Sequence, residues 1–329
     1  MPDCAYLLPL RRKTFCASEA AEWRNYLEQL ARTDCEIVVI DGSPPEVFAK
    51  HHALLHPVCR HIPVDRSYGY LNDKVNGVHT GAAAVTQDKI ILADDDIRYR
   101  ADQLNEIVRL LDRFEVVRPQ NFLRPLPWWA KMESARMLIN RATLRAGDYP
   151  GTCAFRRATF LRVGHYDGDV LFDNEEMIRH FAEKKATICY ALDLLVQKKP
   201  PRFRKWLEQR PRQAYEDFGL RMKTIFFLTL LPLCLLIRVL FGGIALTGFL
   251  WLALIAVLLA LVGVLRGRAR EVVPFSCCLF APLWIAERSL STYAAIFWFV
   301  TRGGYPFGER ILSKGIGRSW RSGARATTR

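Results

Sequence analysis

Three carboxylates directly follow a short apolar run in the stretch Ile90-Ile91-Leu92-Ala93-Asp94-Asp95-Asp96. Such a run predicts a buried strand, and the carboxyl end of that strand would face the crevice in which α/β folds bind ligands. Three adjacent carboxylates repel one another, so we expect a positive group beside them. A divalent cation meets that need, because Mg²⁺ is usually held by one or two carboxylates together with substrate phosphates. The alternative is a solvated turn near a helix start, where carboxylates suit the helix dipole.

The first 200 residues alternate strand and helix signals. Strands are predicted at about 5–10, 35–40, 60–64, 89–93 and 115–118, and helices at about 19–30, 72–86 and 101–114 with a further one ending near 55. This alternation is typical of βαβ units and predicts a mainly parallel, Rossmann-like α/β sheet with helices on both faces. We assign residues 1–200 to this domain, because the chain then becomes basic and proline-containing.

Long apolar segments follow, and residues 223–301 are predicted to form a membrane region. Two transmembrane spans are predicted at about 224–241 and 243–265, since a span needs about 20 apolar residues. Arg238 lies near the end of the first span, where a long basic side chain can reach the interface. A third apolar segment at 272–300 contains Glu287 and Arg288. It fits a span, a re-entrant hairpin or an interfacial helix.

Positive charge gathers around these segments. The net charge is +14, and the tail at 302–329 is basic. By the positive-inside rule the basic flanks are cytoplasmic, which predicts a multi-pass protein of the cell (inner) membrane with its N-terminal domain in the cytoplasm. A nucleic-acid patch is the alternative for the tail. Because the tail adjoins membrane segments, anionic lipid headgroups are favoured instead, and no nucleic-acid partner is predicted.

The cysteines and a group of three histidines are not predicted to form a functional site. The nine cysteines are scattered and lack zinc spacing, which favours reduced thiols over a disulfide framework. His51, His52 and His56 lie close together, but no carboxylate-bearing metal motif accompanies them. A solvated helix face is therefore predicted for these histidines.

Charged residues at three places are predicted to meet at one edge of the sheet. Asp41 follows the second predicted strand, Lys74 opens the helix before the fourth, and the Asp94–Asp96 triplet ends the fourth. These positions would lie along the carboxyl edge of a doubly wound sheet. An acid for a base or ribose, a cation for phosphate and a metal-binding cluster together predict a nucleotide-diphosphate site.

These motifs resemble those of family 2 glycosyltransferases of the GT-A fold. The resemblance covers roughly residues 5–215 and is carried by the order and spacing of Asp41-Gly42-Ser43, Asn72-Asp73-Lys74-Val75-Asn76-Gly77 and Asp94-Asp95-Asp96. It implies that Asp41 contacts the nucleobase of a UDP- or GDP-sugar. It also implies that Asp94 and Asp96 hold Mg²⁺ or Mn²⁺ on the sugar diphosphate. Membrane-anchored members of the family would add C-terminal transmembrane helices.

The stretch Leu171–Arg179 lies where the family carries a Glu-Asp pair before a helix. When Met177 is aligned with the family's leucine, Asn174 falls at the place of the catalytic aspartate, and an amide cannot accept a proton. The general base is then one of Asp173, Glu175 and Glu176, with Asp173 preferred. The alternative is that these acids only complement the dipole at a helix N-terminus.

A further element of membrane-bound family members has a partial counterpart at 208–213. Gln209, Arg210 and Arg212 match the Q-x-x-R-W element, while Gln213 replaces its tryptophan. Arginines at this element can bind a diphosphate through bidentate hydrogen bonds. Residues 201–222 also fit a basic helix lying on a membrane surface, and both interpretations can hold together. Trp128 and Trp129 fit either an acceptor pocket or membrane anchoring.

Together these features predict a metal-dependent, inverting hexosyltransferase. Its acceptor would be a membrane lipid or polyprenyl phosphate, which would explain the anchor. A non-catalytic scaffold that keeps the fold is the first alternative, because Asn174 departs from the family pattern. A membrane-tethered nucleic-acid binder is the second, because of the charge of +14.

Overall fold

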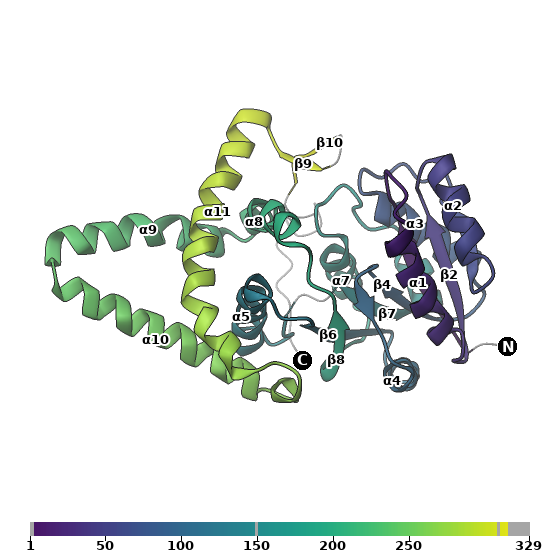
Figure 1. Cartoon of the computed structure of the whole chain (residues 1–329), viewed down its shortest axis with the longest axis horizontal. Coiled ribbons are helices and arrows are strands. Elements are labelled where there is room, and N and C mark those ends of the chain that lie inside the picture. Colours follow the sequence, from purple (N-terminus) through teal and green to yellow (C-terminus); the bar gives the residue numbers. More distant parts are fainter. Residues whose placement is uncertain (1–2, 149–150, 308–309, 315–329) are drawn as a thin grey trace.

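A mixed β-sheet forms the centre of the N-terminal part of the chain (Figure 1). The structure, a computed structural model, describes residues 3–148, 151–307 and 310–314. The strands of this sheet are β1 (Cys4–Leu10), β2 (Cys35–Asp41), β3 (Arg60–Pro63), β4 (Lys89–Ala93), β5 (Ile97–Arg98), β6 (Val116–Leu123), β7 (Thr152–Arg156) and β8 (Ile188–Lys198). The helices are α1 (Ala17–Leu30), α2 (Pro45–Leu55), α3 (Asp73–Ala84), α4 (Ala101–Leu111), α5 (Trp128–Thr143), α6 (Arg157–Val163), α7 (Asp173–Glu183) and α8 (Phe203–Glu216).

The strands lie in the order β3-β2-β1-β4-β7-β6-β8-β5. Strands β1 to β4 pair in parallel, as do β6 and β8, whereas β7 and β5 run antiparallel to their neighbours. The carboxyl ends of β1, β2, β4, β6 and β8 therefore meet at one edge of the sheet. This mostly parallel α/β sheet confirms the predicted fold class, and its arrangement is GT-A-like.

Both faces of the sheet are covered by helices. Tyr6 and Leu8 of β1 pack with α1 and α4, while Ala5 and Leu7 of the same strand pack with α3 and α7 on the opposite face. Successive side chains of a strand point to opposite faces, so burial on both sides requires an unbroken apolar sequence. The same burial fixes the strand ends, which positions the charged residues that follow them.

The cysteines depart from the expectation of reduced thiols. Strands β1 and β2 each begin with a cysteine, and their parallel register places Cys4 opposite Cys35. These two residues form a disulfide, while the other seven cysteines are free. The prediction is therefore wrong at this pair, because strand register brings together residues whose spacing in the sequence matches no disulfide pattern.

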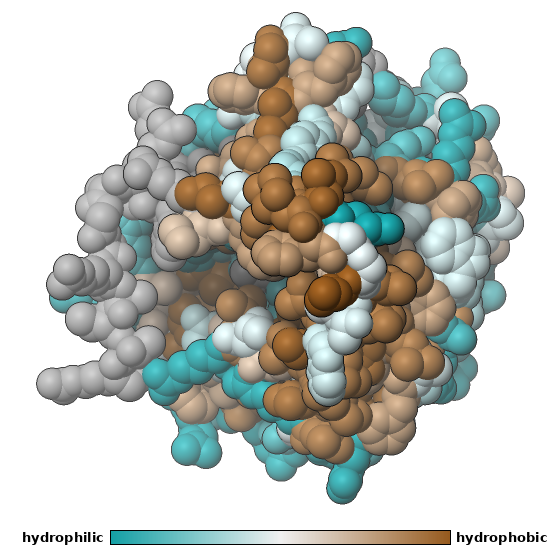
Figure 2. Space-filling view, turned by 90° about the vertical axis from the view of Figure 1, so that its left-hand side faces the viewer, coloured by the Kyte–Doolittle hydropathy of each residue, from teal (hydrophilic) through white to brown (hydrophobic). Residues whose placement is uncertain are grey.

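Helices α9 (Arg221–Phe241) and α10 (Ile244–Leu265) form a hairpin that projects away from the sheet (Figure 1). Residues Met222–Phe241 and Ile244–Leu265 are long and apolar enough to cross a membrane. Only 6% and 22% of these two segments are buried in the structure, and Figure 2 shows large hydrophobic areas at this end of the molecule. By length and composition, the hairpin matches the two predicted spans.

The third apolar segment lies against the rest of the protein. It contains a 3₁₀ segment, Phe275–Phe280, followed by α11 (Ala281–Arg302), which packs on α5, α8 and α9. Arg288 of α11 is buried and donates a hydrogen bond to Asp217 over 2.9 Å. Among the described residues, α11 is not one of the helices apolar enough to count as a span. A small hairpin of β9 (Tyr305–Phe307) and β10 (Arg310–Leu312) follows.

Arg141 of α5 ties the end of α10 to the sheet domain. Its guanidinium donates to the carbonyl oxygens of Arg266 at 2.7 Å, Leu192 at 3.3 Å and Gly263 at 3.5 Å. The last carbonyl groups of a helix lack hydrogen-bond partners within the helix. Arg141 supplies such a partner to the carbonyl oxygen of Gly263 near the end of α10. Arg266 in turn donates to the carbonyl oxygen of Leu144 over 2.5 Å. The α9–α10 hairpin is thus joined to the sheet domain by several polar contacts as well as by packing.

Replacing Gly263 with alanine is expected to disturb the contact between α5 and α10. A Cβ atom at Gly263 would lie 2.0 Å from the carbonyl oxygen of Leu138, so the backbone would have to shift. Overpacking of this kind costs about 1–3 kcal/mol, and the melting temperature in detergent should fall. Gly248→Ala in the same helix is the matched control, since nothing lies within 4 Å of its Cβ position. Equal melting temperatures for the two variants would contradict this contact.

Candidate functional site

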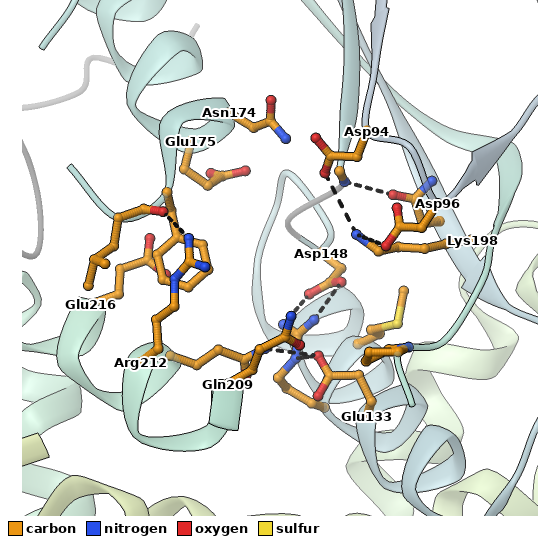
Figure 3. Close-up of a pocket in the computed structure, with 18 of the residues that line it drawn as sticks. Asp94, Asp96, Glu133, Asp148, Asn174, Glu175, Lys198, Gln209, Arg212 and Glu216 are labelled. Atoms are coloured by element: carbon orange, nitrogen blue, oxygen red, sulfur yellow. Dashed lines mark hydrogen bonds and ion pairs between the residues drawn. The ribbon is translucent and has the colours of Figure 1, made fainter. Parts of the chain in front are cut away.

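A cavity of about 390 Å³ lies at the carboxyl edge of the sheet, between the strand ends and helices α5, α7 and α8 (Figure 3). The ends of β4, β6 and β8, the start of α3, and single residues of α9 and α11 also contribute to its lining. Its charged and amide side chains are Asn72, Lys74, Asp94, Asp95, Asp96, Asn121, Glu133, Arg136, Asp148, Asp173, Asn174, Glu175, Lys198, Gln209, Arg210, Arg212, Gln213, Glu216, Lys223 and Arg288. Most of the residues predicted for the site are therefore brought together.

Positive side chains compensate the Asp94–Asp96 triplet. The ammonium group of Lys198 lies 3.4 Å from Oδ2 of Asp96 and 3.8 Å from Oδ2 of Asp94. Asp95 is paired separately with Arg12. Burial raises the pKa of Asp96 to about 6, aided by the neighbouring aspartates and opposed by Lys198. The expected cation beside the triplet is thus supplied, in this structure, by protein side chains.

Lys74 connects the triplet to the acids at the start of α7. Its ammonium group contacts Asp94, lies 3.0 Å from Oδ2 of Asp173 and donates to Oδ1 of Asn174 over 2.8 Å. Asn72 caps α3 by accepting a hydrogen bond from the backbone N–H of Lys74, which fixes the start of this helix. Although burial alone would raise the pKa of Asp94, the attraction of Lys74 and Lys198 lowers it.

The three acids proposed as general base lie in different surroundings. Asp173 and Glu175 line the cavity, and Figure 3 shows Glu175 beside Asn174. Glu175 accepts a hydrogen bond from Arg118 over 2.5 Å, and burial raises its pKa despite the attraction of that guanidinium. Glu176 is 1% exposed, pairs with Arg179 at 3.3 Å and is not among the described residues around the cavity.

Gln209 and Arg212 of α8 lie across the cavity from Asp94 and Asp96 (Figure 3), and Arg210 of the same helix also lines the cavity. Arg210 is buried and pairs with Glu133 of α5 at 2.7 Å. Arg212 donates to the carbonyl oxygen of Leu171 over 2.5 Å, just before α7. The helix that matched the Q-x-x-R-W element therefore contributes both a buried ion pair and side chains at the cavity.

Asp41 lies apart from this cavity in the described structure. It is 2% exposed and contacts His51 at 2.7 Å and His61 at 3.3 Å, while the backbone N–H of Ser43 donates to it over 2.8 Å. Burial would raise its pKa, but these hydrogen bonds lower it below the usual range. The expectation of a solvated face is wrong for His51, because α2 packs this side chain onto the end of β2. A nucleobase contact by Asp41 stays a prediction.

Asp94 and Asp96 fit a divalent cation only in combination with a ligand. Among the described residues, no group of three or more His, Cys, Asp or Glu side chains could hold a metal ion. However, Oδ1 of Asp96 is buried without a hydrogen-bond partner. A cation bound by one or two carboxylates and completed by phosphate oxygens, as is usual for Mg²⁺, fits this pair of side chains.

Several residues of the cavity were not predicted from the sequence. Lys198 is one, although the run Leu194-Leu195-Val196-Gln197-Lys198 ends an apolar strand on a charge, much as residues 90–96 do. Glu216 is another, and burial raises its pKa to about 7. A third group joins α5 to the loop before β7, where Arg136 pairs with Glu133 and Asp148, each at 2.8 Å. Apart from the i,i+3 pair of Glu133 and Arg136, these residues meet across distant parts of the chain, so local spacing does not reveal that they share a site.

No protein-family model and no curated protein matches this chain. Solved structures that it resembles include a mannosyltransferase from Pyrobaculum calidifontis in complex with GDP-Man and Mn²⁺, at 16% identity and a TM-score of 0.49 over 89% of this chain and 87% of that one. Another is glucosyl-3-phosphoglycerate synthase from Mycobacterium tuberculosis in complex with Mn²⁺ and UDP, at 13% identity and a TM-score of 0.42 over 62% and 74% of the two chains.

A putative nucleotide-diphospho-sugar transferase from Desulfovibrio desulfuricans is matched at 13% identity and a TM-score of 0.38, over 60% of this chain and 81% of that one. Identities and scores in this range assign no activity. The order and directions of the strands carry the fold assignment independently. The chain has the GT-A-like fold that its sequence motifs predicted.

Proposed function

We propose that this protein transfers a sugar from a nucleotide diphosphate to a membrane lipid-linked acceptor, with inversion at the anomeric carbon. The observation that carries the proposal is the arrangement around the cavity. Asp94, Asp96 and Lys198 lie at strand ends, Lys74 lies at the start of α3, and the acids Asp173 and Glu175 lie at the start of α7 beside them. A donor diphosphate needs cationic groups beside it, and an acceptor hydroxyl needs a general base. The cavity contains both kinds of group.

The donor end would bind the diphosphate of a UDP- or GDP-sugar. Asp94 and Asp96 would hold Mg²⁺ or Mn²⁺, which supplies positive charge where the leaving nucleoside diphosphate becomes more negative. Lys74 contributes a fixed cation at the same place, because Asp94 and Asp173 hold its ammonium group. Arg212, on the opposite wall, is positioned to contact an anionic group of donor or acceptor.

Glu175 is our candidate for the general base. It lines the cavity, and its raised pKa makes it a better proton acceptor than an ordinary glutamate. Asp173 lines the cavity too, but its carboxylate is engaged by Lys74 at 3.0 Å. Glu175 is itself paired with Arg118 at 2.5 Å, so an ion pair does not separate the two acids, and the raised pKa of Glu175 is the reason for choosing it. Glu176 is directed to Arg179 and lies outside the cavity lining.

The surroundings of the cavity support a lipid-linked acceptor. The apolar α9–α10 hairpin follows α8 directly, and α8 lines the cavity. Phe203 and Leu207 of α8 are exposed, as are the basic residues Arg204 and Lys205. Aromatic and basic side chains on one helix suit the interface of a membrane with anionic lipids. We place the enzyme in the cell (inner) membrane with this domain on the cytoplasmic side.

Nucleotide-sugars are expected to raise the melting temperature of the detergent-solubilised protein. A ligand at 100 times its Kd stabilises the folded state by about 2.7 kcal/mol. UDP- and GDP-sugars should be tested with and without Mn²⁺, and the increase should be larger with the ion. Release of nucleoside diphosphate on addition of lipid extract then tests transfer. A failure of every nucleotide-sugar to shift the melting temperature would count against donor binding.

The protein is expected to behave as an integral membrane protein. Because the exposed apolar side chains of α9 and α10 would lie in hydrocarbon, alkaline carbonate and high salt should leave the protein in the membrane pellet, whereas detergent should release it. A variant lacking residues 222–265 tests whether this hairpin is responsible. Release of the intact chain by salt alone would show that charge, not the hairpin, holds it at the membrane.

Asn174 supports one other function, a non-catalytic membrane scaffold that keeps the fold. This amide accepts a hydrogen bond from Lys74 and cannot take a proton. The scaffold predicts nucleotide binding without turnover, so metal-dependent hydrolysis of any nucleotide-sugar would decide against it.

A further inference from the structure

Lys198 lies where the Asp94–Asp96 pair would receive a cation. Its ammonium group is within 4 Å of Oδ2 of both carboxylates, at 3.8 and 3.4 Å. Figure 3 shows its side chain extending along Asp96 toward Asp94. The position is also tight, because a Cβ atom added to Gly151 would lie 2.7 Å from the ammonium nitrogen and 2.6 Å from Oδ2 of Asp94.

The sheet builds Lys198 into this position. β5, which immediately follows the triplet, pairs with the end of β8 so that Ile97 lies opposite Lys198. The backbone N–H of Lys199 also donates to the carbonyl oxygen of Asp96 over 2.8 Å. The backbone bearing the lysine is thus hydrogen-bonded to the backbone bearing the carboxylates, and the pairing does not depend on a flexible loop.

An ammonium group and a divalent cation compete for the same oxygens. Asp94 and Asp96 are the residues that would hold the ion, and a cation held by their carboxylates would lie near the ammonium group of Lys198. Like charges at such a distance repel strongly, the more so in a partly enclosed site. A diphosphate changes this balance, because its oxygens offer the ammonium group another anionic partner and complete the coordination of the metal ion.

We propose that Lys198 makes metal binding at Asp94 and Asp96 conditional on the donor diphosphate. Without a diphosphate, the lysine neutralises both carboxylates and keeps metal affinity low. With a diphosphate, Lys198 turns to the phosphate oxygens and the carboxylates become available to the ion. The proposal rests on the function proposed above and assigns Lys198 a positioning role, because it acts through the two carboxylates. Departure of the nucleoside diphosphate would then also weaken retention of the ion.

The wild-type protein provides the first test. Free Mn²⁺ is measured by electron paramagnetic resonance during titration of the full-length protein in detergent, alone and with saturating UDP, GDP or inorganic pyrophosphate. Controls without protein correct for Mn²⁺ bound to the phosphates. We expect protein-bound Mn²⁺ to have at least tenfold higher affinity in the presence of one of these diphosphates. Equal affinity with and without all three would overturn the proposal.

Lys198→Met provides the second test, with Lys199→Met as its matched control. The neighbouring Lys199 pairs with Glu22 and does not line the cavity in the described structure. We expect Lys198→Met to bind Mn²⁺ alone about tenfold more tightly than wild type and to lose most of the diphosphate effect. Lys199→Met should match wild type. Unchanged or weaker binding of Mn²⁺ alone by a folded Lys198→Met variant would overturn the proposal.

Folding and function are checked separately. Thermal melting shows whether Lys198→Met is folded, and Lys198→Gln replaces it if it is not; the wild-type titration needs no variant. Nucleotide-sugar turnover is assayed independently of Mn²⁺ binding. Coupled binding of Mn²⁺ and pyrophosphate without turnover of any nucleotide-sugar would support the role of Lys198 while rejecting the proposed function. Turnover in a protein that binds Mn²⁺ equally well with and without diphosphate would support the proposed function while rejecting the role of Lys198.

Discussion

Replacing Asp94 with alanine is expected to lower metal-dependent donor turnover by about a thousandfold, the upper range for removal of one electrostatic contact to a transition state. Asp94 contacts Lys74 and lies near Lys198, so its loss would remove a proposed metal ligand and free two cations that it holds in place. Asp96→Ala should have a similar effect. The measurement is release of nucleoside diphosphate from a nucleotide-sugar with Mn²⁺ or Mg²⁺, with thermal melting as a check of folding.

Asp95→Ala is the matched control for these two variants. Its side chain pairs with Arg12 rather than with Lys198, so its removal should reduce turnover much less. Full activity of either Asp94→Ala or Asp96→Ala would rule out the assignment of these carboxylates to the metal and diphosphate.

Glu175→Gln is expected to reduce kcat by about 10²–10⁴-fold, the usual contribution of a general base. The amide keeps the shape of the side chain but cannot accept the acceptor's proton. Because burial raises the pKa of Glu175 and only the deprotonated form is a base, wild-type activity should fall on acidification at a higher pH than for an ordinary glutamate. The measurement is the pH profile of kcat between about pH 4 and pH 8.

Asp173→Asn distinguishes the two acids that line the cavity. This change removes the ion pair with Lys74, so it should weaken donor binding and raise KM while the acidic limb of the profile persists. If instead Asp173→Asn loses that limb and Glu175→Gln keeps it, Asp173 is the base, as the sequence alone favoured.

The core of the fold could be predicted from the sequence because its signals are local. Residues 90–93 form an apolar run that is buried on both faces of the sheet, and the observed β4 has the predicted bounds of 89–93. The Asp94–Asp96 triplet and Lys74 lie at the expected edge for the same reason. Strand β5 was not predicted, since two residues carry too little pattern to mark a strand, and its partner β8 is about a hundred positions away.

The parts of the site that escaped prediction depend on pairing between distant segments. Lys198 meets the triplet only because β8 pairs with β5, and Glu133 meets Arg210 only because α5 packs near α8. The Cys4–Cys35 pair offered one usable clue, because Cys35 begins one predicted strand and Cys4 immediately precedes another. The sequence around His51 gave no clue to the burial of this side chain, because that burial depends on how α2 packs on the end of β2.

The contacts of Arg141 with the end of α10 bear on how the protein would meet its acceptor. With the hairpin held in a bilayer, these hydrogen bonds and the packing of α5 on α10 prevent the sheet domain from swinging freely. The cavity would then stay at a nearly constant height above the lipid surface. With the proposed lipid-linked acceptor, the search for that acceptor would be lateral diffusion in two dimensions, and acceptors whose reactive group lies at that height would be selected over chemically identical groups in solution.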